Sequence, residues 1–456
     1  MIREYRTVHE LSGRLMVVKD VIGAAVGDTA QLQLPNGDVL PCEVLEVNGD
    51  STLLMLYKDA LGANPSASKV RFTHRPLEVG LSADMLGRVF CARGNPIDNG
   101  PQLLPEVYRD LEGSAQNPKA RISPKDFIQT GISAIDGLNT LACGQKMSIF
   151  SSSGLPHIEL ATRIAGNAKT AGADAKKFAV VFAAIGATHE EYELILSKLS
   201  GSGTLHRLVL FVSLASDPVA ERILVPKMAL TTAEFLAFEK DMNVLVILSD
   251  MTNYCEALRE VSISRGKSSD RYGYPSYMYS DLASIYERAG KLSGSSGSIT
   301  VMPVLTIPGD NLSHPIPAIT TAITDGQIVL SRDLYKRGIM PPVDILRSSS
   351  HLIEKHIGAF KTREDHATLA NQLIAAYSEG KSSVEDISNF GKSALSEHNL
   401  LYARFVDGLE KYFIKQKADE YRPIDKTLDL AWELLSTLPK ADLKRIPTEL
   451  ITRYMP

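Results

Sequence analysis

The chain has 456 residues, which is long for one domain and favours two or three. Hydrophobic residues make up 44% and charged residues 22%, as is typical of a globular protein with a substantial core. The formal net charge of −4 argues against a dedicated nucleic-acid binder, and no apolar run is long enough to span a bilayer. The four cysteines lie far apart and form no C-x-x-C pair, so neither a zinc site nor a disulfide framework is expected. These features, and a charged start without the apolar stretch of a secretory signal, predict a cytoplasmic protein.

Residues 1–75 contain short alternating segments that predict β-strands. Segments 30–34, 39–47 and 51–57 are separated by Asn36-Gly37 and Asn48-Gly49. Asn-Gly between alternating segments is a strong hairpin signal. We therefore expect a small N-terminal β-barrel, which closes its own edges, with a β-meander packed on the next domain as the alternative. Residues 76–130 are rich in turns and predict a connecting region rather than a binding site.

From residue 131 to about 340, apolar runs alternate with helical patterns. The runs suited to buried strands are residues 146–150, 178–185, 208–214, 244–248, 299–306 and 328–330. Helical patterns occur at residues 156–171, 217–240 and 280–292. This alternation predicts a central α/β domain, a mainly parallel sheet covered by helices on both faces, and such sheets bind ligands beyond the carboxyl ends of their strands.

The last part of the chain shows helical periodicity and no strand signal. The helical segments are residues 361–377, 393–414 and 428–438, broken at Gly380, Gly391 and Pro439. We expect a C-terminal helical domain at residues 361–456. The central α/β domain is then expected at 76–360, with 76–130 as its connecting region, and the N-terminal barrel at 1–75.

The segment after the first central strand has the length of a phosphate-binding loop but lacks its chemistry. It runs Ser151-Ser152-Ser153-Gly154-Leu155-Pro156-His157-Ile158, and we call residues 151–157 the serine loop. Aligned with G-x-x-x-x-G-K-[ST], it places Pro156, His157 and Ile158 at the last glycine, the lysine and the hydroxyl. Proline removes an N–H, histidine is mostly neutral at pH 7, and isoleucine cannot ligate Mg²⁺. Taken alone, the segment is also compatible with an ordinary turn.

Seven stretches, in the same order along the chain, resemble the rotary ATPases. They are QTGISAID at 129–136, FSSSGLPH at 150–157, DMTNY at 250–254, YERAG at 286–290, HPIP at 314–317, ITDGQI at 323–328 and KTREDH at 361–366. Each motif is weak alone, but a colinear series over the whole length is specific. More narrowly, the chain resembles the non-catalytic (B) subunit of V/A-type (vacuolar/archaeal-type) ATPases, which alternates with a catalytic partner in a hexameric head.

This resemblance implies a β-barrel, a P-loop-type nucleotide-binding α/β domain and a helical C-terminal domain, in agreement with the patterns above. It implies that the catalytic (A) subunit holds ATP or ADP with Mg²⁺ at the shared interface, and that this chain has no cofactor or metal of its own. It also implies contacts with central shaft and peripheral stalk subunits. The complex would stand on the cytoplasmic face of a membrane, with no direct membrane insertion of this chain and no nucleic acid.

Two further catalytic positions of the family can be located in this sequence, and the general base is missing from one of them. In catalytic relatives a glutamate follows the glycine after the strand that corresponds to residues 178–185. Here Ala187 follows Gly186, and Glu190 and Glu191 come later, where acidic residues favour the start of a helix. Asp250 stands where a Walker-B carboxylate would, but without the loop hydroxyl it forms half a magnesium site, and it can equally hold nearby backbone. We therefore expect no ATP hydrolysis by this chain alone.

The arginine that non-catalytic relatives lend to the neighbouring site is displaced in this chain. The family pattern has it directly after a serine, and His351 occupies that position, with Arg347 four residues earlier. If residues 347–351 form a helical turn, Arg347 shares a face with that position and replaces the missing arginine. In an extended segment the two Cα atoms are roughly 13 Å apart. The other interpretations are that His351 acts as a weaker, pH-dependent donor to the partner's phosphate, or that Arg347 is a surface charge and the site is damaged.

The sequence thus predicts a non-catalytic, regulatory subunit of a V/A-type rotary ATPase or ATP synthase, in which ATP turnover is coupled to H⁺ or Na⁺ transport. Two alternatives belong to other classes. One is a paralogous scaffold that fills the ring without supporting turnover. The other is a stand-alone ATPase with an atypical phosphate loop.

Overall fold

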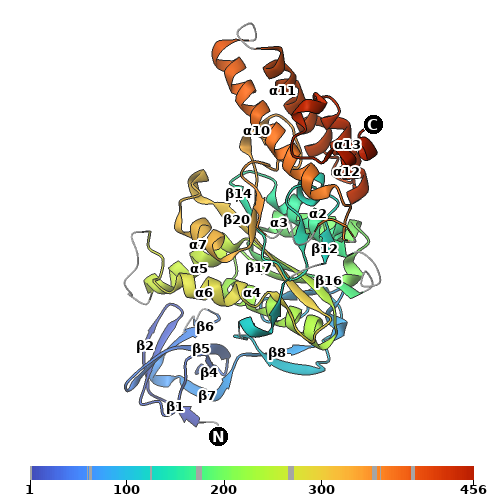
Figure 1. The fold of residues 1–456 in the computed structure, drawn as a ribbon. Helices are drawn as coiled ribbons and strands as arrows, with labels where there is room; N and C mark the ends of the chain where they lie inside the picture. The colour runs from blue at the N-terminus through green and yellow to red at the C-terminus, as the bar shows by residue number, and fades with distance from the viewer. Residues whose placement is uncertain are drawn as a thin grey trace.

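The structure is a computed structural model, and it describes residues 3–58, 60, 64–113, 115–123, 126–170, 177–264, 272–351, 357–359, 361–391 and 396–456. Figure 1 shows a curled β-sheet at the N-terminal end, an α/β layer in the middle and helices at the C-terminal end. The predicted fold class is confirmed. Within the described ranges, no helix is both long and apolar enough to cross a membrane.

The N-terminal part is an antiparallel sheet with the strand order β1-β7-β4-β5-β6-β3-β2. Its strands are β1 (Arg3–Tyr5), β2 (Val8–Ser12), β3 (Leu15–Lys19), β4 (Asp28–Gln33), β5 (Val39–Asn48), β6 (Ser51–Leu56) and β7 (Lys69–Pro76). The predicted hairpins β4–β5 and β5–β6 are confirmed, and Gly37 and Gly49 in their turns adopt the positive φ that favours glycine.

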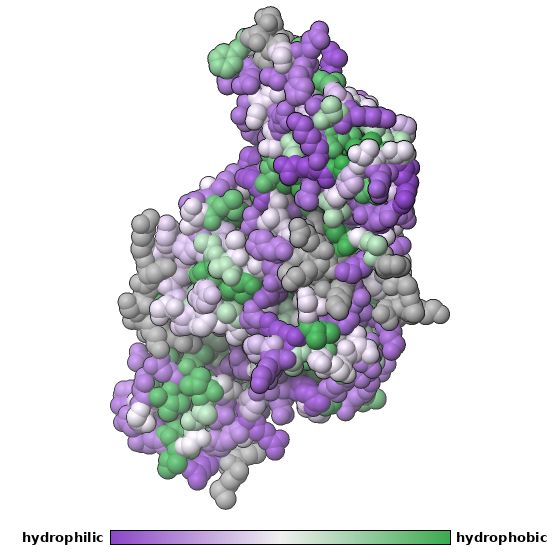
Figure 2. Space-filling model, in the orientation of Figure 1, coloured by the Kyte–Doolittle hydropathy of each residue, from purple (hydrophilic) through white to green (hydrophobic). Residues whose placement is uncertain are grey.

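The N-terminal sheet curls because its two edge strands follow one another in the chain. Only Arg6 and Thr7 separate β1 from β2, so the opposite edges must approach each other. The result is a half-barrel around buried apolar side chains, among them Met16, Leu32 and Phe72. The strand order excludes the simple meander. Figure 2 shows apolar side chains gathered on the visible face of this sheet, at the lower left.

The segment predicted to be a connection also contributes strands. It contains β8 (Glu78–Leu81), η2 (Ala83–Met85), β9 (Val89–Cys91), β10 (Val107–Asp110), η3 (Pro118–Ala120) and β11 (Arg121–Ile122), whereas η1 (Pro65–Ala67) lies before it, between β6 and β7. β8 and β10 form an antiparallel pair. β9 adds to the edge of the central sheet in parallel with the strand that begins at Leu208. The connection is therefore part of the central core.

The central sheet has the strand order β22-β21-β14-β20-β18-β16-β17-β9, and all of these neighbours pair in parallel except β22 with β21. Its strands after β9 are β14 (Ser148–Ser152), β16 (Phe178–Ala187), β17 (Leu208–Leu214), β18 (Asn243–Ser249), β20 (Ser298–Ile307), β21 (Gly326–Val329) and β22 (Ser349–Ser350). Short strands lie beside it: β12 (Phe127–Gln129), β13 (Leu141–Ala142), β15 (Lys169–Thr170) and β19 (Gly290–Leu292). The predicted parallel sheet is confirmed.

Strand β16 shows why a continuous apolar run predicts this architecture. Val180 and Phe182 pack into one core cluster, and Val181 and Ala183 pack into the other, so both faces of the strand are buried. The central helices are α1 (Ser133–Asp136), α2 (His157–Asn167), α3 (His189–Gly201), η5 (Leu205–Arg207), α4 (Val219–Glu234), η6 (Phe235–Glu239), α5 (Met251–Ser264), α6 (Met278–Tyr286), η7 (Pro308–Asp310), α7 (Pro315–Ile323) and α8 (Arg332–Lys336). Helices α2 and α3 cover one face and α4 and α5 cover the other.

The expected helix at residues 280–292 is wrong in its second half. α6 ends at Tyr286, and the chain returns as β19, which is antiparallel to β20. The reversal is fixed by Arg288, which is buried and donates hydrogen bonds to the carboxylate of Glu234 (2.7 and 2.8 Å) and to the carbonyl of Leu111. Helical periodicity did not reveal this buried ion pair.

The C-terminal part is helical, as predicted. Its elements are α10 (His366–Phe390), α11 (Glu397–Gly408), η9 (Leu409–Ile414), α12 (Ile424–Leu435), η10 (Lys440–Asp442) and α13 (Thr448–Tyr454). The expected break at Gly380 is wrong, because α10 continues through it. A Cβ there would lie 2.6 Å from the carbonyl oxygen of Tyr402 and 2.5 Å from a methyl group of Val406. The glycine therefore permits close contact between α10 and α11 instead of ending a helix.

Candidate functional site

The serine loop lies at the carboxyl edge of the central sheet, as predicted. It follows β14, which stands between β20 and β21, and it leads into α2. Ser151 and Ser152 are still part of β14 and are buried, whereas Ser153 and Gly154 are exposed. Gly154 has a φ of 79°, a conformation that favours glycine, and it forms the bend of the loop.

Internal hydrogen bonds hold the second half of the serine loop. The amide of Leu155 donates to the carbonyl of Ser152 (3.0 Å), and the amide of His157 donates to the carbonyl of Leu155 (2.9 Å). The Nδ1 atom of His157 lies 3.0 Å from the same carbonyl, which can only accept, so Nδ1 carries the hydrogen. Ile158 is buried in the core. The positions of the lysine and the hydroxyl thus hold an imidazole bound to its own loop and a core side chain.

Asp250, directly after β18, is engaged by backbone. Its Oδ1 accepts from the amide of Thr252 (2.8 Å), and both carboxylate oxygens accept from the amide of Thr306 (3.1 and 3.2 Å). The Thr252 hydroxyl donates to the Thr306 carbonyl (3.0 Å), so Asp250, Thr252 and Thr306 are all linked by hydrogen bonds. Asp250, Ser153 and His157 line a cavity of about 320 Å³. The carboxylate therefore joins the ends of two neighbouring strands.

The acidic residues after β16 form a helix cap. The amide of Glu191 donates to the hydroxyl of Thr188 (3.2 Å), and the amide of Thr188 donates to the carboxylate of Glu191 (2.8 Å). This reciprocal arrangement is a capping box at the start of α3. Among the residues that the structure describes, no three His, Cys, Asp or Glu side chains are grouped so that they could hold a metal ion.

The segment with Arg347 and His351 is not a helical turn. Arg347 ends a tight turn, in which the carboxylate of Asp344 accepts from its amide (3.2 Å) and from its Nε (2.7 Å). The chain then extends as β22, antiparallel to β21, and the amide of His351 donates to the carbonyl of Asp325 (3.0 Å). Both side chains are exposed, Arg347 to 50%. Arg347 and His351 therefore do not lie on one face of a helix, and Arg347 does not take the position of His351 in the way that a helical turn would allow.

Arg332 and Asp310, which are not among the predicted site residues, lie next to the serine loop. Arg332 at the start of α8 donates from Nη2 to the carbonyl of Ser153 (3.0 Å). It also forms a two-point ion pair with Asp310, through Nε (3.0 Å) and Nη2 (3.1 Å). Arg332 and then the Ser152 hydroxyl lower the pKa of Asp310. Arg332 and Asp310 both follow apolar runs that predict strands, but the strand order that brings them together cannot be obtained from those runs.

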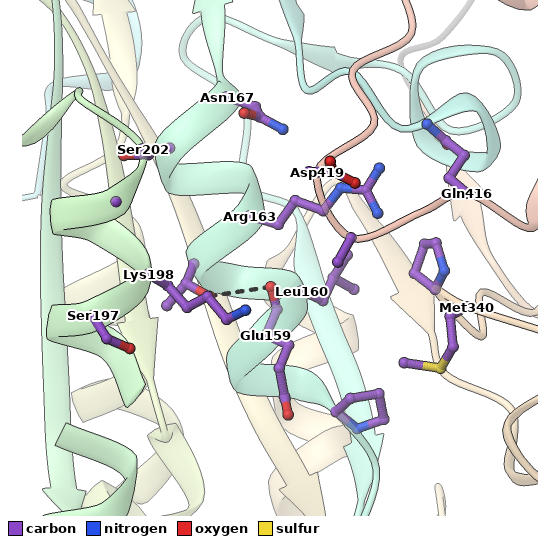
Figure 3. A pocket seen from close by; sticks show the side chains of 16 residues that line it. Glu159, Leu160, Arg163, Asn167, Ser197, Lys198, Ser202, Met340, Gln416 and Asp419 are labelled. Atoms are coloured by element: carbon purple, nitrogen blue, oxygen red, sulfur yellow. Dashed lines mark hydrogen bonds between the residues drawn. The ribbon is translucent and has the colours of Figure 1, made fainter. Parts of the chain in front are cut away.

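A larger cavity of about 720 Å³ lies beside α2 (Figure 3). Arg163 of α2 and Lys198 of α3 line it together with Asp419 from the loop after η9 and Met340. Burial lowers the pKa of the Arg163 guanidinium, which donates from Nη2 to the carbonyl of Glu420. Cations, a carboxylate and apolar atoms share this wall, so the lining alone does not specify an anionic ligand.

Comparisons with known proteins agree with this arrangement. The nucleotide-binding domain of the ATP synthase alpha/beta family matches residues 131–350, and the C-terminal domain of V and A type ATP synthase matches residues 355–455. The solved structure of a unique ATP synthase subunit, NeqB from Nanoarcheaum equitans, is 36% identical to this chain, with a TM-score of 0.75, and the match covers 93% of this chain and 100% of that one.

The fold and the site together define a nucleotide-binding-type α/β subunit with a helical C-terminal domain. The chain belongs to the ATP synthase alpha/beta family, and its C-terminal domain is of the V and A type.

Proposed function

We propose that this chain is the non-catalytic (B) subunit of a V/A-type rotary ATPase or ATP synthase. The observation that carries the proposal is the start of α2, where His157 replaces the lysine and the buried Ile158 replaces the magnesium-binding hydroxyl. The capping box of Glu191 and the backbone contacts of Asp250 support it, since both carboxylates already accept hydrogen bonds from backbone amides. The chain would not hydrolyse ATP alone.

In this proposal the chain alternates with the catalytic (A) subunit in a ring of six. The catalytic partner holds ATP or ADP with Mg²⁺ at the shared interface, and central shaft and peripheral stalk subunits couple turnover to H⁺ or Na⁺ transport. The complex lies at the cytoplasmic face of a membrane. The chain itself divides into a barrel at residues 1–75, a central domain at 76–360 and a helical domain at 361–456.

Arg347 is our first candidate for the contact with the partner's phosphate. Its guanidinium is half exposed and paired with Asp344 from the same turn, so it can exchange the carboxylate for a phosphate oxygen without moving the backbone. His351 is the second candidate and would offer a single ring N–H. An arginine at such an interface contributes roughly 10³–10⁵ in kcat.

The scaffold that fills the ring without turnover is the second candidate function. The observation that favours it is His351 at the position of the family's arginine, combined with the extended backbone that separates it from Arg347.

The test is ATP hydrolysis by the chain alone and mixed with its catalytic partner, for wild type, Arg347→Ala and His351→Ala. We expect the mixture to be active and Arg347→Ala to lose roughly two decades or more of kcat. Asp344→Asn should keep activity, because it frees the same guanidinium. Arg109→Ala is the matched control, since Arg109 is an equally exposed arginine (49%) in an ion pair with Glu239.

Other outcomes assign the role elsewhere. A loss of kcat in His351→Ala alone would indicate that the His351 imidazole is the hydrogen-bond donor to the partner's phosphate. An inactive wild-type ring would establish the scaffold. Hydrolysis by the purified chain alone, abolished by Asp250→Ala, would overturn the non-catalytic assignment.

A further inference from the structure

Three adjacent strands of the central sheet each end in a loop at the same edge. β14 leads into the serine loop, β20 leads into η7 with Asp310, and β21 leads to α8 with Arg332. Since β14 lies between β20 and β21, the two outer loops stand on either side of the serine loop. This strand order brings together residues that are far apart in the sequence.

The two outer loops join each other across the serine loop. The guanidinium of Arg332 meets the carboxylate of Asp310 at two points, 3.0 and 3.1 Å, the fork geometry of the stronger arginine pairs. The same Nη2 atom donates to the carbonyl of Ser153 (3.0 Å), and the pKa of Asp310 is lowered by Arg332 first and by the nearby Ser152 hydroxyl second. Arg332 therefore connects the serine loop, at Ser153, with the loop that follows β20.

The backbone on both sides prepares this contact. Asp310 has a φ of 56°, in the left-handed region that Asp and Asn tolerate better than most residues, and it follows Gly309 with a φ of 61°. On the other side, the Ser331 hydroxyl caps α8 by accepting from the amide of Leu334 (3.4 Å). The amide of Ser331 donates to the carbonyl of Pro342 (2.8 Å). The backbone that carries Arg332 and the backbone that carries Asp310 are thus both held in place.

We propose that Arg332 and Asp310 form a latch that closes over the serine loop and holds it in one conformation without a bound phosphate. A working phosphate loop surrounds its anion with backbone N–H groups. Here the guanidinium of Arg332 holds the loop through the Ser153 carbonyl, and the carboxylate of Asp310 holds that guanidinium in place. This inference concerns the loop of the isolated chain and does not depend on the proposed function.

The latch is exposed to solvent, which sets the size of its effect. The side chains of Arg332 and Asp310 are 40% and 50% exposed, and exposed ion pairs shift an equilibrium by about two- to fivefold and are weakened by salt. Loss of the latch should therefore increase the equilibrium constant for opening of the serine loop by about two- to fivefold. The rest of the sheet should be unaffected.

Amide hydrogen exchange of the full-length chain tests the proposal at Leu155 and His157, whose amides bond within the loop. The variants are Arg332→Gln, Asp310→Asn and the double variant. Asn keeps the tolerance for positive φ, so Asp310→Asn removes the charge without changing the backbone preference. We expect each single variant to exchange about two- to fivefold faster at these amides, and the double variant to exchange no faster than either single one.

A matched control separates the latch from general loss of surface charge. Arg109 and Glu239 form a comparably exposed ion pair (49% and 40%) at 2.9 Å, so Arg109→Gln should leave exchange in the serine loop unchanged. Raising the salt concentration should accelerate loop exchange in wild type but not in the double variant. Wild-type exchange in both single variants, additive effects in the double variant, or an equal effect of Arg109→Gln would overturn the latch.

Discussion

Two polar regions of the molecule are built differently: the edge of the sheet around the serine loop, and the joint between the central and C-terminal parts. At the edge, the carboxylates of the ion pairs Asp310–Arg332 and Asp344–Arg347 are 50% and 22% exposed. At the joint, Glu410 of η9 is 1% exposed. A charge in water can lose its partner at little cost, whereas a buried charge cannot. Loss of one partner should therefore cost little stability at the edge and much more at the joint.

The buried carboxylate at the joint has partners from both parts of the chain. Glu410 accepts from the hydroxyl of Tyr377 (2.8 Å) and the ammonium of Lys381 (3.3 Å), both on α10. It also accepts from the guanidinium of Arg337, which follows α8 in the central part. The side-chain Nε2 of Gln416 donates to the carbonyl of Gly131 (3.0 Å). These contacts fix the helical part to the central sheet.

The largest effect is expected from Arg337→Ala, which breaks the joint. It leaves the buried Glu410 without its partner from the central part, and breaking a buried ion pair costs about 3–5 kcal/mol. We expect about 3 kcal/mol, the lower end of that range, because Arg337 is itself 40% exposed and because Lys381 and Tyr377 remain. Urea unfolding followed by the fluorescence of Trp432, the single tryptophan and a buried one, measures the loss. Arg109→Ala removes one partner of an exposed ion pair and should change the urea midpoint little. Equal shifts of the midpoint in Arg337→Ala and Arg109→Ala would show that buried and exposed ion pairs do not differ in this protein.

The joint should also depend on pH through His366. Burial lowers the pKa of this imidazole to about 4, and its Nε2 donates to the carbonyl of Gly137 (3.0 Å). The unfolded chain binds the proton more tightly, so stability is fully present above about pH 6.5 and falls as the pH drops toward 4. At about 1.4 kcal/mol per pKa unit, the loss is about 2 kcal/mol at pH 5.

The pH prediction is checked by comparing wild type with His366→Gln. The two proteins contain the same carboxylates, so these contribute equally to the pH dependence of both. The difference between their urea midpoints from about pH 7 to about pH 5 therefore measures the contribution of the His366 imidazole. The wild-type midpoint should fall more steeply. Parallel pH dependence in the two proteins would show that His366 does not titrate within this window.

The smallest effect is expected at the edge, at the capping box of α3. Thr188→Ala removes one half of the cap and should lower stability by about 1 kcal/mol. Glu191→Gln keeps an acceptor for the Thr188 amide, so it should change stability little and leave the ATPase activity of the assembled head intact. A large loss of activity in Glu191→Gln would contradict the capping role and make this carboxylate a candidate base.

The sequence predicted those parts of the fold whose cause is local. The Asn-Gly turns gave the hairpins, and the apolar run of β16 predicted a strand buried on both faces. The serine loop was placed at the correct edge because its position follows from the strand before it. For Asp250, one of the two interpretations, contact with nearby backbone, describes its hydrogen bonds. The roles of Arg347 and His351 toward a partner stay predictions.

What the sequence did not predict depends on contacts between distant segments. Asp310 and Arg332 meet because β14 lies between β20 and β21, and strand order cannot be obtained from periodicity. Gly380 looked like a helix end because glycine weakens an isolated helix. In the structure the missing side chain is what α11 requires. Arg288 likewise ends α6 through partners in other elements.

The strand β9 makes the central sheet dependent on residues that precede the nucleotide-binding domain. It pairs with β17 and covers a row of backbone N–H and C=O groups beside the apolar side chains of Leu210, Phe211 and Val212. A fragment that began at Gly131 would leave this row open, and an open apolar edge recruits strands from other molecules. Such a fragment is expected to aggregate.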